Sequence, residues 1–384
     1  MNHARVLLVT NDFPPRVGGI QQYCHDLMSG LAPELVTVFA PSWPGAEEFD
    51  SAAPYRVIRH PATSMTTRYG PIRGLADQVV DLVRRLKVEV VCIGAAYPLG
   101  LLAGRLRNEG GVPCIGFTHG LEVAVTRLPV KRQLMMRIAA EASVLTAVSE
   151  WTAARLRRVA GRQCRIELLA PPVSLQRFHP AVDGSAIRRR HGLGDAPVCV
   201  CVSRFVPRKG QDRLIATWPY VVSRVPGASL LLVGTGRDEQ RLRRLAAASE
   251  VSTNIHFAGQ APAPELAAHY AAGDVFAMPC RTRAFGTDLE ALGIAFLEAA
   301  AVGLPVIAGS SGGAPETVAH GVTGLVVNGA GNAAVGKAIA DLLADPARAR
   351  AMGDAGHRRI RERFALEAVS ERFNAILASV AMAR

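Results

Sequence analysis

The sequence "DLEALGIAFLEAAAVGLPVIAGSSGGAPE" at residues 288–316 places two glutamates, Glu290 and Glu298, around an apolar run. In one continuous helix of 3.6 residues per turn their carboxylates would lie roughly 80° apart, and Gly293 between them disfavours a helix. We therefore expect Glu290 in a loop, a helix that begins at Gly293 or Ile294, and Glu298 in an early turn of that helix. The run "LPVIAG" at 304–309 predicts the strand that follows.

Apolar runs and amphipathic segments alternate along the rest of the chain as well. Strands are predicted at 5–10, 35–40, 88–94, 113–119 and 144–149, and again at 198–204, 229–236, 254–259, 274–279, 304–309 and 323–327. Helical patterns lie between the strands of the first half at 20–32, 71–86, 99–109 and 131–142. This alternation predicts an α/β protein with two Rossmann-like, doubly wound domains that face each other across a cleft.

A polar passage that contains prolines separates the two sets of strands. We expect an N-terminal domain at 1–172 and a C-terminal domain at 173–364, with the linker near 172–182. A helix in 365–384 has no sequential neighbour left to pack on, so we expect it to cross back to the N-terminal domain.

The composition indicates a soluble globular protein of about two domains. The 384 residues are 49% hydrophobic and 20% charged, and the mean hydropathy is +0.18. The first residues lack the apolar region of a signal peptide, and no apolar run is long enough to span a membrane, so we expect a cytoplasmic location. The seven cysteines form no CxxC pair, which predicts free thiols and no structural metal.

The formal net charge of +12 comes almost entirely from arginine. Genome composition would explain it, and so would a phosphate-bearing substrate or an anionic membrane surface. We do not expect nucleic acid as a partner, because the arginine clusters lack interleaved aromatics and a recognised binding motif. Two basic amphipathic stretches, 71–87 and 127–140, are candidates for contact with an anionic membrane, unless they are ordinary surface helices that pack on their own sheet.

The loop that carries Glu290 follows a predicted strand, and ligands of open α/β sheets lie outside the carboxyl ends of the strands. The first amides of the next helix, those of Gly293, Ile294 and Ala295, have no partner within the helix and favour a phosphate. A carboxylate beside phosphates is costly unless it accepts hydrogen bonds from hydroxyl groups. We therefore expect both glutamates to bind sugar hydroxyls and the ligand to be a nucleotide sugar.

These features resemble the retaining glycosyltransferases of the GT-B fold in family 4. Glu290 and Glu298 match the two glutamates of that family, which have seven residues between them. Other motifs of the family match "SRFVPRKGQD" (203–212), "VGTGRDE" (233–239), "MPCRTR" (278–283) and "AGSSGGAPE" (308–316). Within the family, "VTNDFPPRVGGIQQY" (9–23) and "VPRKGQD" (206–212) are most similar to actinobacterial mannosyltransferases that act on phosphatidylinositol monomannoside.

The resemblance implies a retaining hexosyltransferase that needs no metal and no cofactor besides its nucleotide-sugar donor. Its donor would be GDP-mannose, and its acceptor a phosphatidylinositol mannoside-type glycolipid at the inner face of the cell membrane. The N-terminal domain would serve the acceptor and the C-terminal domain the donor. The resemblance implies that Glu290 binds the transferred hexose, that Glu298 binds the ribose, and that Arg204 and Lys209 bind the diphosphate. It places His119 near the sugar and the acceptor, and Gly259 near the base. The residues implied near the phosphates are Gly18, Gly19 and the backbone of Gly293, Ile294, Ala295 and Phe296.

The chain departs from the subgroup on the acceptor side. It has "THGLEVAV" at 118–125, with Leu121 and Val125 where we expect a histidine and a tryptophan-containing segment. A glycosyltransferase that acts on a soluble secondary metabolite, with a different nucleotide sugar, is therefore the alternative. A dinucleotide-binding role for "VGTGRDE" is disfavoured because Glu239 occupies the position of the third glycine.

Overall fold

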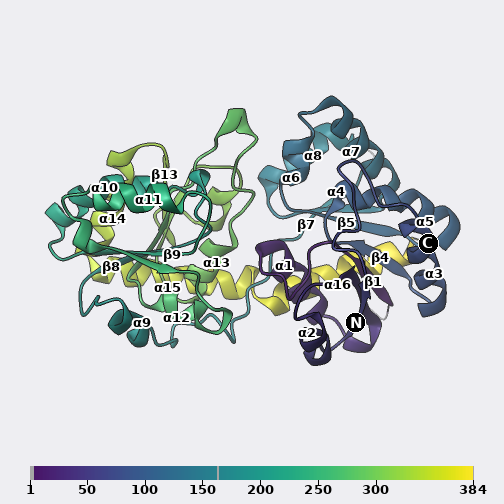
Figure 1. Ribbon diagram of the computed structural model, residues 1–384, viewed down its shortest axis with the longest axis horizontal. Coiled ribbons are helices and arrows are strands. Elements are labelled where there is room, and N and C mark those ends of the chain that lie inside the picture. Colours follow the sequence, from purple (N-terminus) through teal and green to yellow (C-terminus); the bar gives the residue numbers. More distant parts are fainter. Residues whose placement is uncertain (1–3, 162–163, 384) are drawn as a thin grey trace. The chain divides into compact units, whose positions relative to one another are not determined.

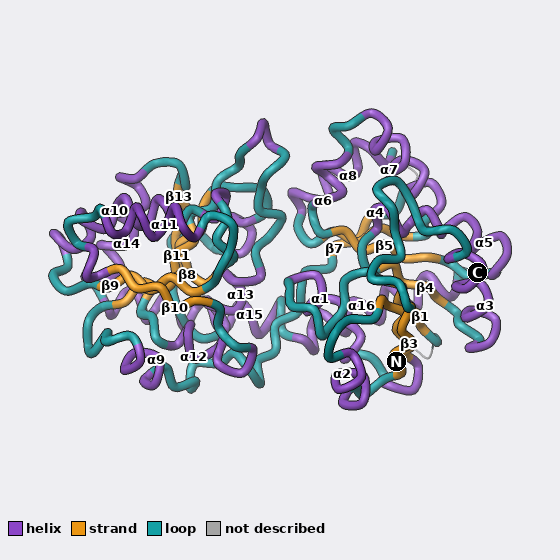
Figure 2. Tube along the Cα trace, viewed as in Figure 1, coloured by secondary structure: helices purple, strands orange, loops and turns teal. Residues whose placement is uncertain are grey.

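The computed structural model describes residues 4–161 and 164–383. The chain divides into two compact units: an N-terminal unit up to Pro172 that also includes the residues from Leu366 on, and a C-terminal unit from Val173 to Ala365. Figure 1 shows both units in the colours of the sequence, and Figure 2 shows a sheet with helices around it in each. Each unit is described by itself below.

The N-terminal unit is built on a parallel sheet whose strand order is β3-β2-β1-β4-β5-β6-β7. Its central strands are buried along their whole length, as expected for a sheet covered by helices on both faces. The strands are β1 (Val6–Val9), β2 (Val36–Pro41), β3 (Arg56–His60), β4 (Val90–Ile93), β5 (Cys114–Thr118), β6 (Val144–Ala147) and β7 (Ile166–Leu168).

Helices fill the connections of this unit. They are α1 (Gly19–Ser29), α2 (Ala46–Ala52), α3 (Leu75–Leu86), α4 (Ala96–Leu99), α5 (Ala103–Gly110), α6 (Leu121–Val125), α7 (Pro129–Glu141), α8 (Glu150–Ala160) and, from the end of the chain, α16 (Leu366–Met382). The apolar stripe of α3 is buried against the sheet, including Leu75, Val79 and Val83. The first basic stretch is therefore an ordinary surface helix, as the alternative reading of 71–87 proposed.

The last helix belongs to the N-terminal unit although almost two hundred residues separate it from the rest of that unit. Val369, Phe373, Ile376 and Val380 recur at spacings of four, three and four, which places them on one face of α16. This face is buried in the core together with residues of α1 and of the sheet, and the Phe373 ring lies edge-on to Phe117 of β5. α16 therefore completes the hydrophobic core of the unit.

The C-terminal unit repeats the same plan with the strand order β10-β9-β8-β11-β12-β13, again all parallel. Its strands are β8 (Val198–Val202), β9 (Ser229–Val233), β10 (Ile255–Gly259), β11 (Val275–Met278), β12 (Val306–Gly309) and β13 (Gly324–Val327). Its helices are α9 (Ser185–Arg190), α10 (Gln211–Arg224), α11 (Glu239–Ala247), α12 (Leu266–Ala271), α13 (Ile294–Ala301), α14 (Asn332–Ala344) and α15 (Pro346–Arg363).

The sequence analysis missed two strands, β3 and β7. Both lie at the edges of the N-terminal sheet and are only partly buried, so "RVIRH" and "IEL" lack a continuous apolar run. Most of the strands that it did predict end one to three residues earlier than expected, since the loops begin at the first polar residue, glycine or proline after several of the apolar runs. All seven cysteines are free thiols, as predicted, and Cys199 and Cys201 lie in the buried strand β8.

In each sheet, successive strands are added first on one side of the first strand and then on its other side. The change of side lies between β1 and β4 in the first unit and between β8 and β11 in the second. The loops that leave such neighbouring strands run to opposite faces of the sheet and leave a crevice at its carboxyl edge, where open α/β sheets bind their ligands. The loops after β8 and β11 carry most of the charged residues singled out in the sequence. The fold thus brings these two loops together at a ligand-binding edge.

Candidate active site

The helix after Glu290 starts where the sequence predicts. α13 begins at Ile294, and Gly293 at its N-cap has a positive φ of 95°, a conformation that glycine adopts without strain. A Cβ at Gly293 would also press on the ring of Phe296, at 2.6 Å from its nearest carbon. Glu290 lies in the loop after β11 and Glu298 in the second turn of α13, so the prediction for both glutamates is confirmed.

Glu290 forms a buried ion pair with Lys209, which lies in the loop after β8. The Lys209 Nζ is 2.6 Å from Glu290 Oε2, and the two side chains are only 11% and 10% exposed. Arg208 adds a second cation, with Nε at 3.8 Å from the same oxygen and Nη1 at 3.2 Å from Asp288 Oδ1. Two cations and two carboxylates therefore meet at the carboxyl edge of the C-terminal sheet.

The loop after β12 holds the backbone of Glu290. Its amide donates a hydrogen bond to Ser311 Oγ at 3.2 Å, and its carbonyl accepts one from the amide of Gly313 at 3.0 Å. Gly312 has a φ of +58°, and a Cβ there would collide with the Glu290 carbonyl oxygen. The glycines of "AGSSGGAPE" thus do more than shape a turn, because they let this loop close around Glu290.

A second ion pair fixes the loop that carries Glu290. Arg281 donates two hydrogen bonds to Asp212 in the first turn of α10, both at 2.8 Å, and its amide donates to the carbonyl of Arg208 at 2.8 Å. Burial opposes the charge on Asp212, but the Arg281 guanidinium outweighs it and holds the pKa of that carboxyl below its ordinary value. The loops after β8 and β11 are therefore tied together.

Not every backbone group at the start of α13 is available to a ligand. The amides of Gly293, Ile294 and Ala295 precede the first intrahelical hydrogen bonds, whereas the amide of Phe296 donates to the Gly293 carbonyl at 3.1 Å. The ring of Phe296 packs edge-on to Phe276 with centroids 5.8 Å apart. Of the predicted backbone positions, the first three have the arrangement that suits an anion.

Arg204 and Gly259 lie at the same edge of the C-terminal sheet but outside the ion-pair cluster. Arg204 is exposed, and within the described residues its side chain makes no ion pair. Its carbonyl accepts a hydrogen bond from Gln211 Nε2 at 3.1 Å. Gly259 ends β10 with a φ of +70°, and its carbonyl accepts from the amide of Gly234 at 2.7 Å.

The glycines of the N-terminal unit lie at the corresponding edge of its sheet. Gly18 and Gly19 are exposed and start α1 after the loop that leaves β1. A Cβ at Gly18 would displace the Gln21 amide, which donates to Asp12 Oδ1 at 2.8 Å. Only glycine at position 18 therefore leaves the Gln21 amide in this place.

His119 follows β5 and has a defined orientation. Its Nε2 lies 2.6 Å from the carbonyl oxygen of Gly94, and because a carbonyl only accepts, Nε2 carries the hydrogen. In the neutral ring Nδ1 is then left as an acceptor. The His119 amide donates to the buried carboxylate of Glu122 at 2.9 Å, and the ring lies edge-on to Tyr23 with centroids 5.0 Å apart.

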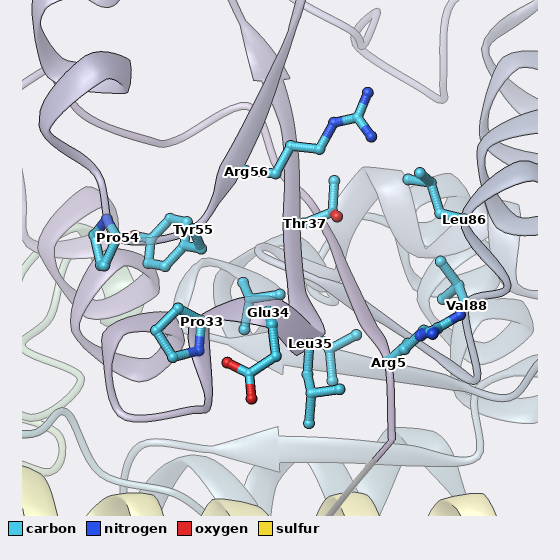
Figure 3. Close-up of a pocket in the computed structure, with 12 residues that line it drawn as sticks. Arg5, Pro33, Glu34, Leu35, Thr37, Pro54, Tyr55, Arg56, Leu86 and Val88 are labelled. Atoms are coloured by element: carbon cyan, nitrogen blue, oxygen red, sulfur yellow. The ribbon is translucent and has the colours of Figure 1, made fainter.

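A hollow of about 570 Å³ lies elsewhere, on the N-terminal unit (Figure 3). Arg5, Leu35 and Arg56 on its wall stand at the amino ends of β1, β2 and β3, the edge opposite to the one where open α/β sheets bind ligands. We therefore do not assign the substrate to it.

The structure also bears on metals and membranes. Over residues 4–161 and 164–383, no three histidine, cysteine, aspartate or glutamate side chains gather so that they could hold a metal ion. Among the helices of the same residues, none combines the length and the apolar content that a membrane crossing requires.

Sequence reasoning found Lys209, Glu290 and Glu298 but missed Arg208, Asp288 and Ser311. Arg208 stands directly before Lys209 in "PRKG", so its position was visible, but nothing local shows that its guanidinium turns toward Asp288. Ser311 carries no local signal at all, because its partner is 21 residues away in the sequence. These contacts exist only once the loops after β8, β11 and β12 are brought together.

The ion pair generates a prediction about stability. Lys209→Met should lower the free energy of unfolding by about 3 kcal/mol, because it leaves the buried Glu290 carboxylate without its nearest cation. The double variant Lys209→Met with Glu290→Gln should recover most of this loss, since neither charge is then left unpaired. Urea denaturation measures both. Lys337→Met, which breaks an exposed pair with Asp341, is the matched control and should change stability by less than about 1 kcal/mol.

A loss for Lys209→Met no larger than that of the control would contradict this description of the pair. So would a double variant that is less stable than Lys209→Met alone.

Comparison with known proteins shows the family of the chain. The family model "Glycosyltransferase Family 4" matches residues 17–177, and "Glycosyl transferases group 1" matches residues 183–359. The GDP-mannose-dependent alpha-(1-6)-phosphatidylinositol monomannoside mannosyltransferase of Mycolicibacterium smegmatis is 48% identical over 91% of this chain and 92% of its own. The GDP-mannose-dependent monoacylated alpha-(1-6)-phosphatidylinositol monomannoside mannosyltransferase of Corynebacterium glutamicum is 44% identical over 98% of both chains.

Solved structures agree on the fold. HepE of Anabaena, crystallised with UDP and glucose, superposes with a TM-score of 0.82 at 18% identity and covers 98% of this chain and 100% of its own. WaaG, a glycosyltransferase involved in lipopolysaccharide biosynthesis, superposes with a TM-score of 0.70 at 19% identity, over 97% of this chain and 99% of its own. The chain has the GT-B fold and belongs to the glycosyltransferases of family 4.

Proposed function

We propose that this enzyme is a retaining hexosyltransferase that moves mannose from GDP-mannose to a phosphatidylinositol mannoside-type glycolipid. The names of the relatives that match nearly the whole chain supply the donor and the acceptor class. The observation that carries the proposal is the charge cluster at the crevice of the C-terminal sheet. There a glutamate that could bind hydroxyl groups, a buried lysine and the start of a helix lie together.

In this proposal the donor binds to the C-terminal unit. The diphosphate takes the free amides of Gly293, Ile294 and Ala295 and the charges of Arg204 and Lys209. Lys209 then leaves Glu290 for the phosphates, and the freed carboxylate accepts hydrogen bonds from hydroxyls of the hexose. Glu298 accepts hydrogen bonds from the ribose, and the base lies near Gly259.

The same cations serve the chemistry. The diphosphate gains negative charge as its bond to the anomeric carbon breaks, so fixed cations stabilise the transition state more than the ground state. We propose that these cations, rather than a metal ion, neutralise the leaving group, and that no cofactor is needed besides the donor. Both glutamates bind hydroxyl groups, so retention would proceed by displacement on one face. The acceptor oxygen bonds to the anomeric carbon while its proton passes to the departing phosphate oxygen.

The N-terminal unit would serve the acceptor. His119 offers Nδ1 as a hydrogen-bond acceptor, and Gly18 and Gly19 leave the backbone of their loop open to a phosphate. Of the two residues that depart from the subgroup, Val125 is buried in the core of the unit, whereas Leu121 is exposed at the start of α6. Leu121 is therefore the substitution that bears on the acceptor, and a soluble secondary metabolite remains the second candidate acceptor.

The proposal is tested by a donor and acceptor screen read by mass spectrometry. We expect transfer of one hexose from GDP-mannose to phosphatidylinositol monomannoside, with little or none from UDP-glucose. Arg204→Ala and Lys209→Ala should each lower kcat/KM by about two to three orders of magnitude, because each removes a charge from the leaving group. Near-normal kinetics in both variants would rule out the assigned roles, and transfer only to soluble acceptors would favour the second candidate.

Calorimetry of ligand binding should distinguish the roles of Glu298 and Glu290. Glu298→Ala should weaken binding of GDP and of GDP-mannose alike, by about ten- to a hundredfold, because each ligand loses a charged hydrogen-bond partner for its ribose. Glu290→Ala should spare GDP, since Lys209 is then free for the phosphates, and should weaken GDP-mannose. The reverse pattern would exchange the two roles.

We also propose that the enzyme is cytoplasmic and works as a peripheral protein at the inner face of the cell membrane, where a lipid acceptor would lie. The start of α7 supports this proposal. Leu128 and Val130 are 51% and 58% exposed, and Met136 is exposed as well, beside the basic residues Lys131 and Arg132. The apolar residues on which the amphipathic pattern of 127–140 rests are Leu134, Met135 and Ile138; Met135 and Ile138 are buried in the core, and Leu134 is partly buried against it. Exposed apolar side chains next to basic ones suit an anionic membrane surface.

The membrane proposal predicts co-sedimentation with phosphatidylinositol-containing vesicles at low salt, and less as salt screens the charges. Lys131→Glu with Arg132→Glu should weaken binding by at least about tenfold, since each basic residue near an anionic surface contributes about 1 kcal/mol. Arg348→Glu with Arg350→Glu, on exposed residues of α15, changes the net charge equally and is the matched control. If both double variants lose the same amount of vesicle binding, the binding depends on the net charge of the protein and not on Lys131 and Arg132 in particular.

A further inference from the structure

Glu298 is bonded to a buried tyrosine from another helix. The hydroxyl of Tyr270, on α12, donates a hydrogen bond to Glu298 Oε2 on α13 at 2.6 Å. Tyr270 is fully buried, and Glu298 is partly buried. Within the described residues Oε1 of Glu298 accepts no hydrogen bond. The tyrosine thus occupies one carboxylate oxygen and leaves the other to a ligand.

Aromatic packing fixes the direction of the tyrosine hydroxyl. The Tyr270 ring lies edge-on to Phe178 with centroids 6.0 Å apart, and it is tilted against Phe276 at 5.7 Å. Phe276 in turn packs on Phe296 of α13, two residues before Glu298. The same stack therefore holds the donor and the helix that carries the acceptor, so the hydrogen bond has little freedom to change.

The hydrogen bond also acts on the charge of the carboxylate. Burial raises the pKa of Glu298, while the hydrogen bond from Tyr270 and the charge of Arg177 lower it. His357 of α15 faces the end of α13 instead, with Nδ1 at 2.8 Å from the Ala301 carbonyl oxygen. Burial, and then the neighbouring Glu298, raise the pKa of Tyr270, so the phenol keeps its proton and stays a donor.

We propose that Tyr270 is the positioning residue of the ribose subsite: its hydroxyl holds Glu298 Oε2, so that Oε1 accepts hydrogen bonds from the ribose hydroxyls of the nucleotide. Tyr270 does not touch the ligand and acts only through Glu298. The inference rests on the proposed function, because it takes Glu298 as the ribose ligand. It goes beyond that function by assigning the orientation and the ionisation of Glu298 to a residue outside the motifs of the sequence.

Tyr270→Phe tests the inference, because it removes one hydroxyl and keeps the packed ring. Calorimetry compares binding of GDP with binding of 2′,3′-dideoxy-GDP, which lacks the ribose hydroxyls. The wild-type protein should prefer GDP. Tyr270→Phe should bind GDP about tenfold more weakly than the wild type does, and should bind the dideoxy ligand almost as well as the wild type does. The ratio of its affinities for GDP and for the dideoxy ligand should therefore be smaller than that of the wild type.

The pH dependence gives a second readout. The ionised carboxylate of Glu298 is a stronger acceptor for the ribose hydroxyls than the protonated acid, so affinity for GDP should fall as pH falls through the pKa of Glu298. Without the tyrosine hydroxyl this pKa is higher, so the affinity of Tyr270→Phe should decline at a higher pH than that of the wild type. Tyr220→Phe, on an exposed tyrosine of α10, is the matched control and should leave both readouts unchanged.

The variant Glu298→Gln shows whether a negative result concerns the role of Tyr270 or the proposed role of Glu298. If it loses the preference for GDP while Tyr270→Phe keeps the wild-type preference and pH dependence, the ribose role of Glu298 stands and the inference about Tyr270 is wrong. If Tyr270→Phe loses equal affinity for both ligands, the tyrosine is structural and the inference is wrong as well. If the wild type itself shows no preference for the hydroxyls, the proposed role of Glu298 fails, and the inference fails with it.

Discussion

The ion pair between Lys209 and Glu290 is the interaction around which the loops of the C-terminal unit are arranged. Two charges largely removed from water cost free energy unless they meet each other and further polar groups. The loops supply these groups: Arg208 and Asp288 add a second pair of charges, and Ser311 and Gly313 bind the backbone of Glu290. The charges of this cluster therefore balance one another without a ligand, and two of its members, Lys209 and Glu290, are the residues proposed to bind the diphosphate and the hexose.

The parallel sheet determines where this cluster forms. Lys209 and Glu290 are 81 residues apart in the sequence, and they meet because β8 and β11 are neighbours at the point where the sheet changes its direction of growth. Close approach of the loops then depends on glycine. Gly312 lies against the Glu290 carbonyl, and Gly234 and Gly236 lie against the loop after β8, where a Cβ would meet backbone oxygens.

The two units use the same plan for different chemistry. In the C-terminal unit the loops at the carboxyl edge carry charges in close pairs, which suits a diphosphate and its sugars. In the N-terminal unit the same edge carries a histidine held by the Gly94 carbonyl and a glycine-rich turn. A fold that is repeated in this way leaves function to the loops, and HepE and WaaG share this fold with the chain at less than 25% identity.

The α/β class, most of the strands, the start of α13 and the placement of Glu290 before that helix could all be predicted from the amino-acid sequence. This was possible because apolar periodicity, a positive-φ glycine and a motif of fixed spacing are local properties. Only the tertiary structure decided that Glu290 pairs with Lys209, that Arg208 and Asp288 join them, and that Tyr270 holds Glu298. It also decided that α3 buries its apolar stripe and that Val130 and Met136 of α7 are exposed while Met135 and Ile138 are buried. These contacts join segments that are distant in sequence, and burial depends on which surfaces the packed elements leave uncovered.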